Sequence, residues 1–170
     1  MKVFISYHLL DRKYRIKTEN ILKHYNIDYY VVPENIDFNG KSHQFIEDFL
    51  CKEIKKCDIL LCLIGKETYS RPHVDRELHT ALKGDITERL GIIGVHLDTR
   101  TDSLDTIDLN TFPKKLWDNK NYVIWTNWKD LNSNLLELLD FAIKNAKNNK
   151  IITNHSNKCL QLRGSRYYSN

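Results

Sequence analysis

Two side chains capable of acid–base chemistry share one predicted helical face near the middle of the chain. His73 and Glu77 are four positions apart, so they project from the same side of a helix. Val74 and Leu78 form an adjacent apolar stripe that would face the protein core. This position would allow a Glu77 carboxylate that is partly removed from water. On spacing alone, however, the prediction is a solvated surface glutamate.

Several other site chemistries have no matching motif in the sequence. Neither Gly-x-Gly-x-x-Gly nor the phosphate loop of P-loop nucleotidases occurs, and the Gly-x-Ser-x-Gly motif of hydrolases is missing as well. The seven histidines and four cysteines show no paired metal spacing. We therefore expect no bound metal. We also expect the cysteines to be reduced core residues, as in the cytosol.

The elements that must position these side chains follow a regular pattern. Short runs rich in β-branched and aromatic residues lie at 3–7, 29–32, 59–64, 92–97 and 122–125. Segments with helical periodicity lie at 10–25, 45–54, 74–82 and 131–146, and Asp11 is expected to cap the first of them. Alternating strands and helices predict an α/β fold, in which a central five-stranded parallel sheet carries helices on both faces. The segment 98–121 is the exception, with an irregular polar loop and at most a short helix near 112–117.

Charge divides the chain into a body and a tail. The 26 basic residues exceed the 22 acidic ones by four, and residues 148–170 contain four basic residues and no acid. Residues 1–147 are therefore neutral overall and are predicted to form one domain, followed by a polar basic tail, 148–170, that is disordered or packed on it. Nucleic acid is not an expected partner, because its binding needs a basic face on the folded body. No apolar run approaches the roughly 20 residues of a membrane span, and no signal peptide is recognisable, so we expect a cytoplasmic protein without membrane contact.

Several short motifs along residues 2–146 resemble those of Toll/interleukin-1 receptor (TIR) domains. The first box of that family is matched by Phe4-Ile5-Ser6-Tyr7, and its Ser-x-x-Trp-Cys-x-x-Glu-Leu stretch by Ser70-x-x-His73-Val74-x-x-Glu77-Leu78. Further similar segments are 33–37, 57–65, 92–96 and 124–126. More narrowly, the chain resembles the bacterial TIR-like proteins of the Thoeris antiphage defence system. The resemblance implies a flavodoxin-like, three-layer fold.

This resemblance also implies an enzyme of the NAD glycohydrolase or ADP-ribosyl cyclase type, which cleaves the nicotinamide–ribose bond of NAD. The Thoeris product is a signalling nucleotide, a cyclic ADP-ribose isomer or a related ADP-ribose conjugate, that activates a separate effector protein. NAD is the substrate and no cofactor is required. The catalytic glutamate of the family corresponds to Glu77. The family's aromatic residue four positions earlier is His73 here, which offers less stacking surface than indole.

Loops at the carboxyl ends of the predicted strands supply the remaining candidate substrate contacts. Ser6, Tyr7 and His8 follow the first strand and are candidates to contact NAD, the alternative being that Ser6 and Tyr7 simply end that strand. Asn35 and Asp37 lie in a polar loop after the second strand. That loop either closes over the ligand, contacts a second subunit or is plainly solvated.

The resemblance extends to partners and leaves two other functions open. TIR active sites are often completed by a neighbouring molecule, so a homo-oligomer formed through TIR–TIR contacts and a phage-derived trigger are expected. One alternative is a non-catalytic module that uses the same fold for TIR–TIR assembly. The other is an enzyme like the nucleoside deoxyribosyltransferases, which also use a glutamate against a glycosidic carbon. Such an enzyme would consume deoxynucleosides and leave NAD untouched.

Overall fold

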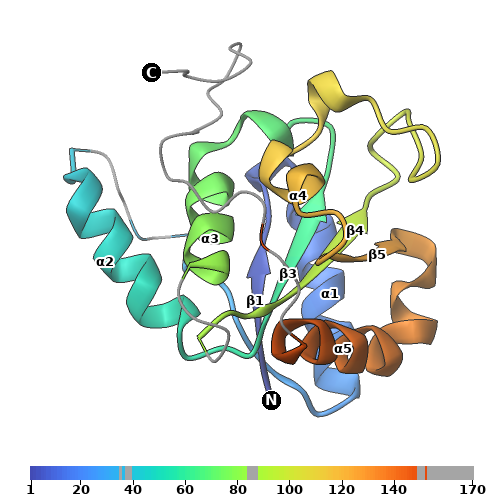
Figure 1. The fold of residues 1–170 in the computed structure, drawn as a ribbon, viewed down its shortest axis with the longest axis horizontal. Coiled ribbons are helices and arrows are strands. Elements are labelled where there is room, and N and C mark those ends of the chain that lie inside the picture. The colour runs from blue at the N-terminus through green and yellow to red at the C-terminus, as the bar shows by residue number, and fades with distance from the viewer. Residues whose placement is uncertain (35, 37–39, 84–87, 149–151, 153–170) are drawn as a thin grey trace.

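Five parallel strands form the central layer of the protein (Figure 1). The structure, a computed structural model, describes residues 1–34, 36, 40–83, 88–148 and 152. The strand order is β2-β1-β3-β4-β5, with every neighbouring pair parallel. The strands are β1 (Lys2–Ser6), β2 (Asp28–Tyr30), β3 (Ile59–Ile64), β4 (Gly91–His96) and β5 (Ile124–Asn127). The predicted α/β fold with a five-stranded parallel sheet is confirmed.

Helices cover both faces of this sheet, so the fold has three layers. Figure 1 shows α2 and α3 on one side of the strands and α1 and α5 on the other. The helices are α1 (Arg12–His24), α2 (His43–Ile54), α3 (Pro72–Leu82), α4 (Lys114–Asp118) and α5 (Leu131–Lys147). Short 3-10 helices lie at η1 (Leu9–Asp11), η2 (Thr68–Ser70), η3 (Leu109–Thr111) and η4 (Trp128–Asp130).

Successive strand residues alternate between two apolar cores. Phe4 of β1 and Cys62 of β3 belong to the core beneath α2 and α3. Their sequence neighbours Ile5 in β1 and Leu61 in β3 point to the other face and belong to the core beneath α1 and α5. β3 and β4 are buried along their whole length, as their uninterrupted apolar sequences predict. Even-numbered residues of β1 therefore face α3, which decides what Ser6 can contact.

The connection between β4 and β5 is irregular except for η3 and the short helix α4, as predicted. A buried carboxylate holds this connection together. Asp102 accepts hydrogen bonds from the Arg100 guanidinium at 2.7 and 2.5 Å and from the backbone N–H of Asp108 at 2.8 Å. The ring of His96, at the end of β4, lies 3.0 Å from the same carboxylate. These contacts fix the loop to the sheet without regular structure.

Three expectations about individual elements differ from the structure. The second strand is Asp28–Tyr30, shorter than predicted, because the chain leaves the sheet edge soon after it. Cys51 is exposed on the outer side of α2, so the prediction that the cysteines fill the core is wrong at that position, whereas Cys57 and Cys62 are buried. Asp11 stands at the N-cap position of α1, but its side chain makes no capping hydrogen bond.

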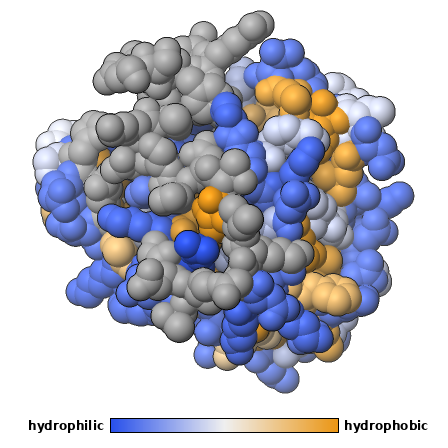
Figure 2. Space-filling model, viewed as in Figure 1, coloured by the Kyte–Doolittle hydropathy of each residue, from blue (hydrophilic) through white to orange (hydrophobic). Residues whose placement is uncertain are grey.

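The predicted tail, 148–170, lies outside the described residues except for its first residue and Ile152. On the face seen in Figure 2, hydrophobic residues of the described part form small groups among polar and charged ones. Large apolar side chains that remain exposed include Leu10 of η1, Leu109 of η3 and Phe141 of α5. Within the described residues, no helix combines the length and apolar character that crossing a bilayer requires.

Candidate active site

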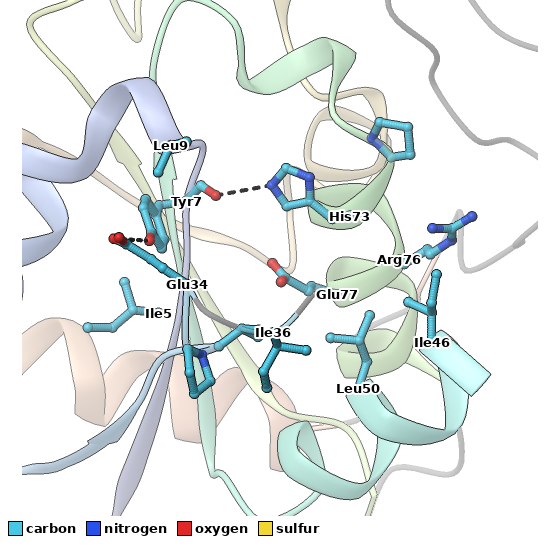
Figure 3. A pocket seen from close by; sticks show the side chains of 13 residues that line it. Ile5, Tyr7, Leu9, Glu34, Ile36, Ile46, Leu50, His73, Arg76 and Glu77 are labelled. Atoms are coloured by element: carbon cyan, nitrogen blue, oxygen red, sulfur yellow. Dashed lines mark hydrogen bonds between the residues drawn. The ribbon is translucent and has the colours of Figure 1, made fainter. Parts of the chain in front are cut away.

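A pocket of about 610 Å³ opens beside the carboxyl end of β1 (Figure 3). Its walls come from β1, the loop after β2, α2 and α3. The position agrees with the general rule that ligands bind at the carboxyl ends of strands in an open parallel sheet. The apolar lining residues are Ile5, Leu9, Val32, Pro33, Ile36, Ile46, Leu50 and Pro72. The polar side chains are Tyr7, Glu34, His73, Arg76 and Glu77.

The helix α3 carries Glu77 into this pocket. Pro72 opens the helix, and Val74 and Leu78 are buried against the sheet, as the sequence pattern predicts. Glu77 is only 5% exposed, so the solvated surface glutamate that spacing alone predicted is wrong. Its Oε2 atom accepts a hydrogen bond of 2.5 Å from the hydroxyl of Ser6, a residue 71 positions earlier in the chain. Two elements distant in sequence therefore meet at this carboxylate.

Burial changes the acid–base behaviour of Glu77. Removal from water disfavours the charged form and raises the pKa of the carboxyl to about 8, while the hydrogen bond from Ser6 acts in the opposite direction. A large fraction of Glu77 is therefore protonated at neutral pH. A cation that enters the pocket would favour the carboxylate and drive release of that proton.

His73 lies one turn before Glu77 on the same helix and also lines the pocket. Its Nε2 atom is 3.3 Å from the backbone oxygen of Tyr7, a contact drawn in Figure 3. Because a carbonyl oxygen only accepts, Nε2 carries the proton. Burial lowers the pKa of His73, so the ring is neutral and Nδ1 is left as a hydrogen-bond acceptor. The helix thus presents a neutral ring and a titratable carboxyl side by side.

Comparison with known proteins assigns the fold and this site region to a family. The family described as "Thoeris protein ThsB, TIR-like domain" matches residues 4–102. The chain belongs to this family. The matched interval runs from β1 through β4 and includes Ser6, His73 and Glu77.

No curated protein matches the chain. A solved structure titled "Structure of the activated Roq1 resistosome directly recognizing the pathogen effector XopQ (TIR domains)" is 19% identical, with a TM-score of 0.46. That alignment covers 88% of this chain and 84% of the other.

In this TIR-like domain the residues at the end of β1 and just after it point in different directions. Ser6 is 1% exposed and contacts Glu77 beneath the pocket surface. Tyr7 lines the pocket, and its hydroxyl donates to Glu34 at 3.2 Å. His8 is buried outside the lining, with its ring centre 6.3 Å from that of His73. Asn35 lies outside the described residues, as does Asp37.

Sequence reasoning does not identify Glu34 and Arg76, two charged residues in the pocket wall. The carboxylate of Glu34 also binds the guanidinium groups of Arg12, at 2.9 Å, and Arg15, at 2.7 Å. These contacts fix the start of the loop after β2 against α1. The sequence feature that could have identified Glu34 as a pocket residue is its place in a loop at the carboxyl end of a predicted strand. Arg76 has no such signal beyond its position next to Glu77.

The carboxyl edge of the sheet holds one more buried acid, Asp11. Its Oδ1 accepts a hydrogen bond from the Thr99 hydroxyl at 3.3 Å, and burial raises the pKa of the carboxyl. The carboxylate lies against Gly65, where an added Cβ would fall 2.1 Å from Oδ2. This close approach to β3 explains why Asp11 does not turn back to cap α1. Among the described residues, no cluster of three or more metal-ligating side chains occurs.

Proposed function

We propose that this protein is an NAD-processing enzyme that cleaves the nicotinamide–ribose bond. The observation that carries the proposal is the buried carboxylate of Glu77 in the wall of a pocket at the carboxyl end of the sheet. Membership of the Thoeris ThsB TIR-like family supports it. The pocket volume, about 610 Å³, falls within the roughly 300–1,000 Å³ typical of small-molecule sites.

One carboxylate is enough for this reaction. Nicotinamide departs as a neutral molecule from a cationic pyridinium, so no general acid is required to protonate it. The barrier comes from positive charge that builds on the ribose, as in other oxocarbenium-like transition states. A carboxylate of Glu77 beside the ribose opposes that charge in a site shielded from water.

The surrounding groups suit a cationic substrate. A neutral His73 does not repel the pyridinium, and its Nδ1 atom is able to accept a hydrogen bond from a ribose hydroxyl. The apolar side chains of Ile46 and Leu50, which line the pocket from α2, offer contact area to a flat ring. We assign the ribose and nicotinamide to the Glu77 side of the pocket.

We further propose that the product is an ADP-ribose-derived signalling nucleotide that activates a separate effector in antiphage defence. A cyclic ADP-ribose isomer or a related conjugate results when the ribosyl cation is captured by a nucleophile within the same nucleotide or from a second molecule. Capture by water would give free ADP-ribose instead. The identity of the nucleophile decides between signalling and simple hydrolysis.

The test is mass spectrometry of the products formed from NAD by the purified full chain, with and without lysate from phage-infected cells. We expect nicotinamide and an ADP-ribose-derived nucleotide in at least one of these conditions. Glu77→Gln keeps the shape of the side chain and removes its charge, so turnover should fall by at least about 100-fold. Glu137→Gln makes the same change on the exposed side of α5 and serves as the matched control.

The two alternatives give different results in the same experiment. A non-catalytic assembly module would produce no nicotinamide under any condition. A deoxyribosyltransferase-like enzyme would consume deoxynucleosides and leave NAD unchanged. Normal NAD turnover by Glu77→Gln would remove the proposed site while leaving an NAD-consuming activity to be located elsewhere.

A further inference from the structure

We propose that Ser6 is a positioning residue, whose hydroxyl holds one oxygen of the Glu77 carboxylate so that the other oxygen is presented to substrate. This inference rests on the function proposed above and adds a second residue to its mechanism. Ser6 itself does not line the pocket, so it acts through Glu77 and not on the substrate.

The fold dictates that these two residues meet. Ser6 is the last residue of β1 and an even-numbered one, so it faces the core beneath α3, as Phe4 does. Glu77 is on the buried face of α3, between Val74 and Leu78. Ser6 at the end of the strand and Glu77 on the helix therefore meet although they lie far apart in the sequence. Their hydrogen bond is buried.

The hydrogen bond makes the two carboxylate oxygens different. Oε2 accepts from Ser6 at 2.5 Å. Within the described part of the chain, Oε1 accepts no hydrogen bond, and it is not among the fully enclosed unpaired atoms. Because Glu77 lines the pocket, Oε1 is the atom that meets a ligand. The arrangement fixes the carboxylate plane before substrate arrives, which avoids the cost of ordering it later.

Ser6 also favours the charged form of Glu77. Burial raises the pKa of the carboxyl, and the Ser6 hydrogen bond is the contact that lowers it. Cys62, the register partner of Ser6 on β3, has its pKa raised by burial and by the nearby Glu77, so its thiol stays neutral. Cys62 also shares a side-chain hydrogen bond with Ser6, which acts to lower that pKa but by less. Other titratable or charged groups around the site are Tyr7, His8, Asp11, Glu34, His73 and Arg76. The hydrogen bond that the described structure gives to the Glu77 carboxylate comes from Ser6.

The decisive experiment is a titration of Glu77 followed by NMR of protein labelled with ¹³C at glutamate carboxyl groups. Comparison with Glu77→Gln assigns the resonance. We expect the wild-type carboxyl to titrate near pH 8 and the Ser6→Ala carboxyl to titrate at least about one pH unit higher, since a hydrogen bond to a charged acceptor is lost. A Ser6→Ala titration that coincides with the wild type would overturn the proposal.

Control variants separate a positioning role from a general effect on the fold. Thr18→Val removes a buried hydroxyl from α1, which bonds the backbone oxygen of Tyr14 far from the pocket, and should leave the Glu77 titration unchanged. Ser6→Thr keeps the donor and should restore most of the wild-type titration. If Ser6→Ala does not fold, Ser6→Cys replaces the hydroxyl with a weaker donor of similar size and should give an intermediate shift.

NAD turnover provides the second readout. At pH 7, Ser6→Ala should lose about tenfold in turnover for each unit by which the Glu77 pKa rises, because the ionised fraction falls by that factor. Part of this loss should disappear as the pH is raised above both titrations. If the wild type turns over no NAD, the proposed function fails, but the NMR titration still decides whether Ser6 controls the carboxyl. A pH-independent loss would assign Ser6 a purely structural role.

Discussion

At the scale of single residues, burial acts on two neighbouring side chains so that both favour their neutral forms. It raises the pKa of Glu77 to about 8 and lowers that of His73. These two side chains therefore add little charge to the pocket near neutral pH. A pyridinium cation stabilises an ionised carboxylate but not an imidazolium. Negative charge therefore develops on Glu77 when a cationic ligand binds.

His73 gives the first prediction at this scale. His73→Phe keeps an aromatic ring but removes both the donor to the Tyr7 carbonyl and the Nδ1 acceptor. We expect the KM for NAD to rise about fivefold to 50-fold, equivalent to one lost hydrogen bond, with a smaller change in kcat. Steady-state kinetics measured by nicotinamide release provide the test.

Two other variants serve as comparisons for this prediction. His73→Lys places a cation beside the pyridinium and should weaken NAD more than His73→Phe does, since like charges repel in a site of low dielectric. His24→Phe changes a histidine at the end of α1 and should leave the kinetics unchanged. Equal kinetics for His73→Phe and the wild type would exclude a role for the imidazole nitrogens.

At the scale of elements, α3 is held at its outer side by a buried ion pair with α4. The ammonium of Lys115 lies 2.6 Å from the Asp75 carboxylate, and both side chains are almost fully buried. Burial raises the pKa of Asp75, and the attraction of Lys115 partly offsets that effect. Because Asp75 is two residues before Glu77, this pair anchors the helix that carries the proposed catalytic group.

Breaking this pair should cost more than removing it entirely. Lys115→Met leaves a buried carboxylate without its partner, and we expect a loss of about 3–5 kcal/mol in the free energy of unfolding. Asp75→Asn should cost a similar amount, since it leaves a buried ammonium. The double variant should cost clearly less than the sum of the two, because neither charge is then stranded. Urea denaturation of the four proteins measures this coupling, and additive losses would show that the pair is not the anchor.

The same scale shows what sequence can and cannot predict. β3 and β4 are recognisable because strands buried on both faces need uninterrupted apolar residues, and α3 because Val74 and Leu78 repeat at helical spacing. Local periodicity places Glu77 beside that buried stripe but does not predict that its carboxyl is buried. It does not reveal Ser6 as the partner, because that contact depends on the register of β1 against the rest of the fold. The Glu34 contacts with Arg12 and Arg15 depend on tertiary approach in the same way.

At the scale of the whole molecule, the proposed catalytic carboxyl reduces the stability of the fold. An unfolded chain leaves Glu77 with its ordinary pKa of 4.5, whereas the folded chain raises that value to about 8. Between these pH values the native state binds the additional proton, so the free energy of unfolding falls as the pH rises. The penalty is complete above about pH 8 and absent below about pH 4.5.

Replacing the carboxyl with an amide should therefore stabilise the protein in a pH-dependent manner. Glu77→Gln cannot ionise, so its unfolding free energy lacks this slope, which amounts to about 1.4 kcal/mol for each unit of pKa shift. We expect the melting temperature of Glu77→Gln to exceed that of the wild type at pH 8.5 and the difference to shrink steadily toward pH 5. Glu137→Gln, at an exposed site, should track the wild type throughout. Parallel melting curves for Glu77→Gln and the wild type across this range would mean that the native carboxyl does not hold the additional proton. The gain in stability at high pH together with the loss of NAD turnover would show that the fold gives up stability in order to keep a charge at its active site.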